Sequence, residues 1–296
     1  MDTPHTSPNA SNPGQRLRDF AQLFRLPVGI MAGIAGCATI VALNHTVPVH
    51  HYWLTALILF CMMSAACAIN DYWDVEKDRV DHPERPLPSG RLMPQQVWYT
   101  AAILFGCALV ASIPLGIYPF LLVAVSTAVL WEYSHLLTLN GILGNLIVAT
   151  VISGLIFLGS LVAGRPFAML YPIGFLFCLA FAKEVVWDIH DAEGDRRQGI
   201  VTIANRLGDQ TAFTIAWGLL ILLLGSIPLA VTLLPMAHPW VFTVFALITV
   251  ISLGIALARF QTQRSSQTYE AFVLWDRLSM VFGVVALLGT AAPLSV

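Results

Sequence analysis

Long apolar stretches separated by short polar breaks run through the whole chain. Nine such stretches can be followed, and they cover residues 20–43, 52–70, 95–113, 117–135, 142–163, 167–187, 211–234, 239–258 and 271–293. An apolar stretch of about 20 residues is long enough to cross the hydrocarbon core of a bilayer as a helix. The pattern therefore predicts an all-α, polytopic membrane protein with about nine transmembrane helices.

The polar breaks differ in length and character. Most are short and carry turn residues, such as Asn140-Gly141 and the stretch 164–166. Two connections, 71–94 and 188–210, are longer and strongly charged. Residues 1–15 are polar and rich in Pro, Ser and Asn, a composition typical of disorder. We expect a disordered N-terminal tail over 1–15 and a single transmembrane helical domain over 16–296.

The composition agrees with this interpretation. The chain is 57% hydrophobic and 11% charged, whereas a soluble domain typically has about 25% charged residues. Its mean hydropathy is +0.75. The net charge of −2 gives no reason to expect a nucleic-acid partner. The lipid bilayer is the environment that this composition indicates.

The distribution of Lys and Arg predicts an orientation. If the N-terminus is inside, fourteen of the fifteen basic residues fall at inner helix ends or in inner connections, and only Arg165 lies on the other side. Cytoplasmic loops carry such an excess of Lys and Arg. We therefore expect the N-terminus and both charged connections to be cytoplasmic.

Acidic residues are concentrated in two places, which we call the first acidic segment (residues 70–78) and the second acidic segment (188–195). Within each, carboxylates are spaced by three and four residues, so on a helix they share one face. The segments follow the second and sixth apolar stretches and so reach the same side of the membrane. We expect a cleft between the two halves of the chain that opens toward the cytoplasm.

Several carboxylates on one helix face repel one another, and divalent cations relieve that repulsion. Oxygen ligands without cysteine favour Mg²⁺, which prefers a few carboxylates plus the oxygens of a phosphate ligand. Basic residues next to the same segments suit a diphosphate. These residues are Lys77, Arg79, Arg85, Lys183 and Arg196. One acidic connection alone would favour a hydrated, salt-bridged loop; two with matching spacing favour a metal–diphosphate site.

Aromatic residues gather near the same helix ends, and two interpretations stay open. Tyr and Trp are enriched at membrane interfaces whatever the function. Alternatively, they line a pocket for an isoprenoid chain, where ring faces stabilise an allylic cation. The residues are Tyr72, Trp73, Trp98, Trp131, Tyr133 and Trp187. Glu132 and Asp276 also lie at helix ends, and the sequence assigns neither a role.

At the two acidic segments the chain resembles the UbiA superfamily of intramembrane prenyltransferases. That superfamily's first signature, NDxxDxxxD followed by an Arg-Pro pair, is matched by Asn70, Asp71, Asp74, Asp78 and Arg85-Pro86. Its second signature is matched by Asp188, Asp191 and Asp195. The stretch 141–145 is also similar to the superfamily's fifth helix. The similarity extends over nearly all nine predicted helices.

The resemblance implies a nine-helix bundle around a central cavity that binds Mg²⁺ and an isoprenyl diphosphate. The implied catalytic and metal-binding residues are Asp71, Asp74, Asp78, Asp188, Asp191 and Asp195. The candidate substrate-binding residues are Asn70, Lys77, Arg79, Arg85, Tyr133, Lys183, Trp187 and Arg196. The implied reaction ionises the diphosphate and transfers the prenyl group to a lipophilic acceptor.

Two departures from the superfamily pattern keep a second reaction open. Thr138 and Trp187 stand where many relatives have lysine, and Lys183 is a replacement one helical turn before Trp187. Fewer lysines in an aromatic cavity would suit a terpene cyclase, in which a substrate double bond captures the cation. A third hypothesis, an anion transporter, fits less well, because transporters usually place charges near the bilayer midplane. We prefer the prenyltransferase.

Overall fold

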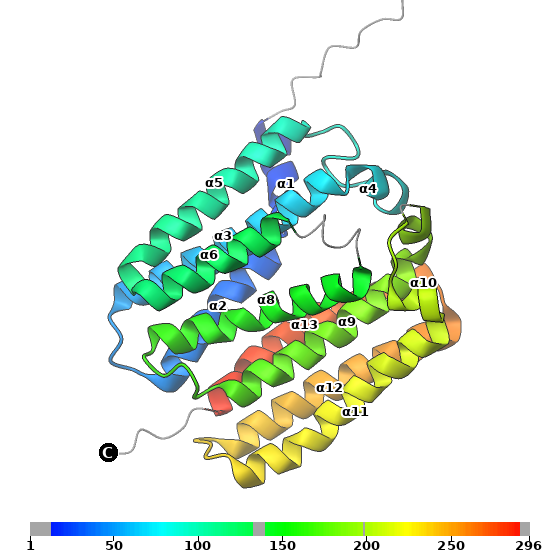
Figure 1. The fold of residues 1–296 in the computed structure, drawn as a ribbon. Coiled ribbons are helices and arrows are strands. Elements are labelled where there is room, and N and C mark those ends of the chain that lie inside the picture. The colour runs from blue at the N-terminus through cyan, green and yellow to red at the C-terminus, as the bar shows by residue number, and fades with distance from the viewer. Residues whose placement is uncertain (1–12, 133–139, 198, 291–296) are drawn as a thin grey trace, which may run out of the picture.

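The structure is a computed structural model, and it describes residues 13–132, 140–197 and 199–290. Within these residues all regular structure is helical, and the helices run roughly side by side in one bundle (Figure 1). The predicted all-α class is therefore confirmed. The helices are α1 (Pro13–Leu23), α2 (Leu26–Leu43), α3 (Val49–Trp73), α4 (Val75–Asp81), α5 (Pro94–Ser112), the 3-10 helix η1 (Ile113–Leu115), α6 (Ile117–Trp131), α8 (Gly141–Val162), α9 (Leu170–Arg197), α10 (Ile203–Leu207), α11 (Asp209–Leu233), α12 (Pro239–Gln263) and α13 (Ser266–Gly289).

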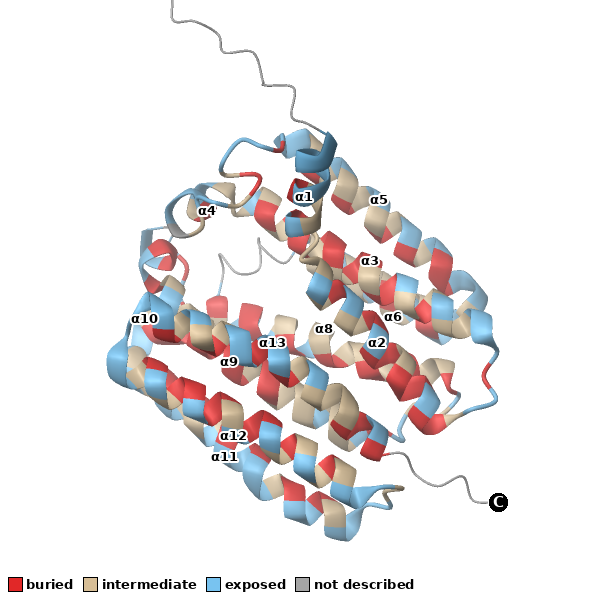
Figure 2. Ribbon diagram, turned by 180° about the vertical axis from the view of Figure 1, so that it is seen from behind, coloured by how far each residue is buried: buried red, intermediate tan, exposed pale blue. Residues whose placement is uncertain are grey.

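Eight of the described helices are long and apolar enough to cross a membrane, and α6 is a shorter apolar helix of 15 residues. Together they match the nine predicted stretches over the described part of the chain. Their outward faces carry large hydrophobic side chains that are more than half exposed, such as Ile103 and Val110 on α5 and Ile221 and Leu229 on α11. Figure 2 shows exposed positions recurring along these helices beside buried ones. Such surfaces suit lipid rather than water. The protein is an integral, multi-pass membrane protein.

The first predicted stretch, 20–43, is two helices rather than one. Helix α1 ends at Leu23, and Arg25 has a left-handed backbone with φ of 46° before α2 begins. Pro27 explains the break, because proline has no amide to donate to the Leu23 carbonyl four residues earlier, and its ring would clash with that carbonyl in a continuous helix. Helix α1 begins at Pro13, so the last three residues of the predicted tail are helical.

A second difference concerns the first acidic segment, which does not lie on one unbroken helix. Helix α3 ends at Trp73 and α4 begins at Val75, with Asp74 between them at φ −92° and ψ 14°. The Asp74 amide donates to the Asn70 carbonyl, and the Asp78 amide donates to the Asp74 carbonyl. The helical hydrogen-bond spacing thus continues through the break, so the side chains stay close together.

Helix α2 joins the two halves of the bundle, because it packs against α3 on one side and against α8 and α13 on the other. Its contact with α8 depends on glycine. A Cβ atom at position 159 would lie 2.7 Å from the Thr39 Cβ and 2.9 Å from the Gly36 carbonyl oxygen. The halves lie beside each other, and the two charged connections reach the same end of the bundle (Figure 1).

Candidate active site

A cavity of about 1200 Å³ lies between the two halves of the bundle. Its charged lining consists of ten acidic side chains and five from Lys or Arg, and it comes mainly from the ends of α3 and α9, from α4 and from α13. Most of the remaining lining is apolar and comes from α2, α3, α6, α8, α9 and α13. We call the region around residues 71–78 and 188–195 the acidic end of the cavity.

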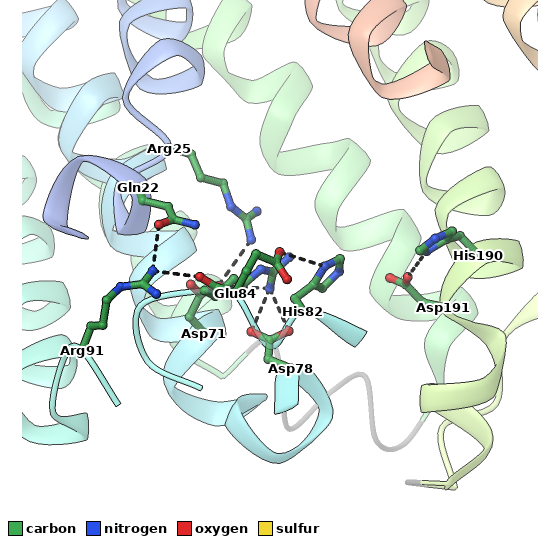
Figure 3. Close-up of polar contacts among 10 residues, drawn as sticks. Gln22, Arg25, Asp71, Asp78, His82, Glu84, Arg91, His190 and Asp191 are labelled. Atoms are coloured by element: carbon green, nitrogen blue, oxygen red, sulfur yellow. Dashed lines mark hydrogen bonds and ion pairs between the residues drawn. The ribbon is translucent and has the colours of Figure 1, made fainter. Parts of the chain in front are cut away.

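In the first acidic segment, two arginines hold two buried aspartates. The Arg85 Nη1 atom donates to both carboxylate oxygens of Asp78 at 2.8 Å and lies 3.5 Å from Asp71 Oδ1. The Arg25 Nη2 atom donates to the same Asp71 oxygen at 3.3 Å. Figure 3 shows Arg25 reaching Asp71 from the start of α2. The sequence analysis did not identify Arg25 as a site residue, although it lies two residues before Pro27.

Helix α1 fixes the connection that carries Arg85. The Arg91 Nε atom donates to the buried Asp19 carboxylate at 2.8 Å, and one of its Nη atoms donates to Gln22 at 3.1 Å and to the Glu84 carbonyl at 2.8 Å. These contacts tie residues 84–91 to the N-terminal helix beside the cavity (Figure 3).

The second acidic segment lies on α9, which stays helical through Arg197. The Asn145 amide of α8 donates to Asp188 at 2.7 Å. The His190 Nδ1 atom lies 2.8 Å from an Asp191 oxygen, and the His190 ring stacks on Tyr269 of α13 with centroids 3.6 Å apart. Figure 3 shows Asp191 pointing from α9 toward the first acidic segment.

One ion pair joins the two acidic segments directly. The Lys77 Nζ atom of α4 lies 2.5 Å from Asp195 Oδ1 of α9, and both side chains are largely buried. All six aspartates predicted to bind metal line this one cavity, and so do Asn70, Lys77, Arg85, Lys183 and Trp187. The two acidic segments therefore face the same space, as the sequence analysis expects.

Three predicted site residues take other places or cannot be located. Arg79 and Arg196 are more than half exposed, pair with Glu76 and Glu193 on their own helices, and are absent from the cavity lining. Their positions face away because each lies one residue beyond a cavity-lining position. Tyr133, like Thr138, lies outside the described residues.

Lys183 has a partner that the sequence does not indicate. Its Nζ atom lies 2.6 Å from Asp276 Oδ1 of α13, and the two side chains are 8% and 2% exposed. The sequence analysis assigned no role to Asp276. In the structure it neutralises the buried Lys183 ammonium. Lys183 therefore lines the cavity as one member of a buried ion pair between α9 and α13.

The acidic end suits Mg²⁺ by its chemistry. Among the described residues, no three Asp, Glu, His or Cys side chains converge closely enough to cage a metal. Mg²⁺ does not need a cage, since it is usually held by one or two carboxylates, phosphate oxygens and waters. Burial raises the pKa of the Asp74 carboxyl to about 6; the charge of Lys77 opposes this rise, and the charge of Asp78 adds to it. A cation beside this carboxylate would compensate its lost hydration.

Two relatives with similar sequences carry the same enzyme name. The chain is 34% identical over 179 residues to a digeranylgeranylglyceryl phosphate synthase of Sulfolobus acidocaldarius; the match covers 60% of this chain and 65% of that protein. It thus spans just under two thirds of that relative. A synthase of the same name from Methanosarcina mazei is 26% identical over 287 residues, which cover 90% of this chain and 99% of the relative.

Solved structures share the fold. A UbiA homologue from Aeropyrum pernix superposes with a TM-score of 0.74 at 17% identity, covering 88% of this chain and 98% of that one. A UbiA homologue from Archaeoglobus fulgidus, bound to GPP and Mg²⁺, gives 0.69 at 13% identity, covering 91% and 99%. The sequence profile of the UbiA prenyltransferase family matches residues 30–283. The chain belongs to the UbiA prenyltransferase family.

Proposed function

We propose that the protein is a Mg²⁺-dependent intramembrane prenyltransferase that makes digeranylgeranylglyceryl phosphate. The name of its curated relatives implies a glyceryl phosphate that carries two geranylgeranyl groups. The donor is then geranylgeranyl diphosphate, and the lipophilic acceptor is a glyceryl phosphate that already carries one geranylgeranyl group. None of the relatives compared above is named a terpene cyclase.

The proposal rests mainly on one observation: carboxylates from distant parts of the chain face each other across one end of a cavity whose remaining lining is mostly apolar. The Lys77–Asp195 pair bridges the two acidic segments. A diphosphate held there would leave its prenyl chain against the apolar walls. The cavity exceeds the roughly 300–1,000 Å³ usual for small-molecule sites, which favours an occupant with long chains.

In this proposal the acidic residues bind the metal and the basic residues bind the diphosphate. The residues that would hold the metal are Asp71, Asp74, Asp78, Asp188, Asp191 and Asp195, with Asn70 beside them as ligand or orienting group. When bound, Mg²⁺ supplies positive charge that weakens the bond between the diphosphate and the allylic carbon. Lys77 and Arg85 pair with Asp195 and Asp78 among these aspartates, and they would contact the diphosphate through charge-assisted hydrogen bonds.

The distribution of charge also supports an orientation. The acidic end lies at the same end of the bundle as the basic connections around Lys77, Arg85 and Arg206. Cytoplasmic loops are enriched in Lys and Arg. We propose that the acidic end faces the cytoplasm, from which a water-soluble diphosphate head group and Mg²⁺ enter.

The test is product analysis with the purified protein in detergent. Geranylgeranyl diphosphate, geranylgeranylglyceryl phosphate and Mg²⁺ are incubated with the protein, and lipids are analysed by mass spectrometry. We expect the doubly prenylated phosphate, and none after EDTA treatment. A cyclic hydrocarbon formed from geranylgeranyl diphosphate alone would contradict the proposal in favour of a cyclase. No conversion under any of these conditions would also contradict it.

A further inference from the structure

One carboxylate of the cavity is not explained by metal or diphosphate binding. Glu184 lies on α9 and lines the cavity, four residues before Asp188, so the two side chains share one helix face. With a rise of 1.5 Å per residue, Glu184 lies about 6 Å farther along the axis from the acidic end than Asp188. The metal-binding proposal does not use it.

Glu184 marks a boundary in the lining of α9. The cavity-lining residues before Lys183 on this helix, including Phe175, Leu176 and Leu179, are apolar. From Lys183 onward the helix contributes charged groups to the lining, with Trp187 between them. A prenyl diphosphate with its head group at the acidic end would place its reacting C1 carbon near this boundary, because C1 joins the polar head to the apolar chain.

The immediate charges around Glu184 come from several elements. They are Lys183, Asp188 and Asp191 on α9, Asp276 on α13 and Arg25 before α2. Lys183 is already paired with Asp276 and Arg25 with Asp71. Among the described residues no hydrogen bond or ion pair reaches the Glu184 carboxylate. Glu270, another lining carboxylate, is exposed near the start of α13 and so lies in a different setting.

The proposed reaction needs a group with these properties. Ether formation joins the acceptor oxygen to C1 of the donor, and the bond between C1 and the diphosphate oxygen breaks with its electron pair leaving on diphosphate. The acceptor hydroxyl must lose its proton in the same process. An aspartate engaged with metal is a poor proton acceptor, because the cation stabilises its charged form.

We propose that Glu184 is the catalytic base that takes the proton of the acceptor hydroxyl. The inference rests on the proposed function, since it requires a hydroxyl acceptor. The carboxylate accepts the proton as the C–O bond forms and returns it to water once the products leave. General-base catalysis of this kind contributes about 10²- to 10⁴-fold to the rate.

The test compares Glu184→Gln and Glu184→Asp with the wild type. The matched control is Glu193→Gln, because Glu193 lies on the same helix, is exposed and pairs with Arg197. We measure kcat with geranylgeranylglyceryl phosphate, and separately the Mg²⁺-dependent retention of labelled geranylgeranyl diphosphate. We expect Glu184→Gln to lower kcat at least 100-fold with donor retention unchanged, Glu184→Asp to recover part of the rate, and the control to match the wild type.

The outcomes separate this inference from the proposed function. If wild type forms no doubly prenylated product, the proposed function fails, and the role of Glu184 with it. If wild type forms product and Glu184→Gln is as fast, the role of Glu184 alone is overturned. Loss of donor retention or of thermal stability in both Glu184 variants would also overturn it, because the residue would then serve binding or folding.

Discussion

Lys77 of α4 and Asp195 of α9 form an ion pair of 2.5 Å between segments 118 residues apart in the chain. The pair places a cation of the first acidic segment beside a carboxylate of the second. Burial lowers the pKa of the Lys77 ammonium, whereas the neighbouring carboxylates raise it, and the net effect is a raised pKa. Lys77 therefore stays charged at neutral pH, as the proposed contact with an anionic head group requires.

Replacing Lys77 by Gln should weaken donor binding. Losing a charge-assisted hydrogen bond, worth about 1.5–3 kcal/mol, corresponds to roughly a tenfold to hundredfold higher KM for geranylgeranyl diphosphate. The matched control is Arg79→Gln, since Arg79 is exposed and pairs with Glu76 outside the cavity. The test is to measure KM for geranylgeranyl diphosphate by steady-state kinetics in the wild type and in both variants. Equal effects at both positions would show that surface charge, rather than the cavity, attracts the donor.

Magnesium and protons should compete at Asp74. Burial raises the pKa of this carboxyl to about 6, so in metal-free protein it is mostly protonated below pH 6 and mostly ionised above pH 7. Mg²⁺ binds the ionised form. We expect the half-saturating Mg²⁺ concentration to rise up to about tenfold per pH unit below 6 and to be level above 7. An unchanged Mg²⁺ requirement between pH 5 and pH 8 would contradict this assignment.

The buried Lys183–Asp276 pair should stabilise the packing of α9 against α13. Removing one partner leaves an uncompensated buried charge, which typically costs about 3–5 kcal/mol. We expect Asp276→Asn to lower the melting temperature in detergent clearly. The double variant Lys183→Met/Asp276→Leu should recover much of the loss, because it buries no charge. A single variant as stable as wild type would mean that water or lipid head groups reach this pair.

The contact between α2 and α8 should not tolerate a side chain at position 159. In Gly159→Ala the new Cβ would lie 2.7 Å from the Thr39 Cβ, and such overpacking costs about 1–3 kcal/mol. Gly154→Ala on the same helix is the control, because no atom of another helix lies within 4 Å of its Cβ position. Thermal unfolding of both variants provides the comparison. Equal melting temperatures would contradict the close helix approach.

Much of the fold was predictable because membrane-spanning helices are specified by local composition. Each predicted stretch overlaps a long described helix, since an apolar run of this length has few alternatives in a bilayer. The exceptions are local. The break at Arg25 follows from Pro27, which is visible in the sequence. No proline or glycine near Asp74 indicates the second break.

The residues that meet in the cavity could be predicted where the sequence repeats a spacing of carboxylates. They could not be predicted where a residue's partner lies far away along the chain. The six aspartates follow from the two matching signatures. Arg25 and Asp276, by contrast, enter the site through contacts 46 and 93 residues away along the chain, and no periodic pattern links such pairs. Arg79 and Arg196 were expected at the diphosphate because of nearness in sequence alone. Helix geometry turns them outward.

The most direct test of the central claim is whether both acidic segments are needed to hold one ligand. Retention of labelled geranylgeranyl diphosphate by purified protein is measured with and without Mg²⁺ for wild type, Asp74→Asn, Asp191→Asn and the exposed control Asp209→Asn. We predict Mg²⁺-dependent retention by wild type and the control, and its loss in both other variants. Retention that survives in either of those two variants, or that needs no Mg²⁺, would contradict the account.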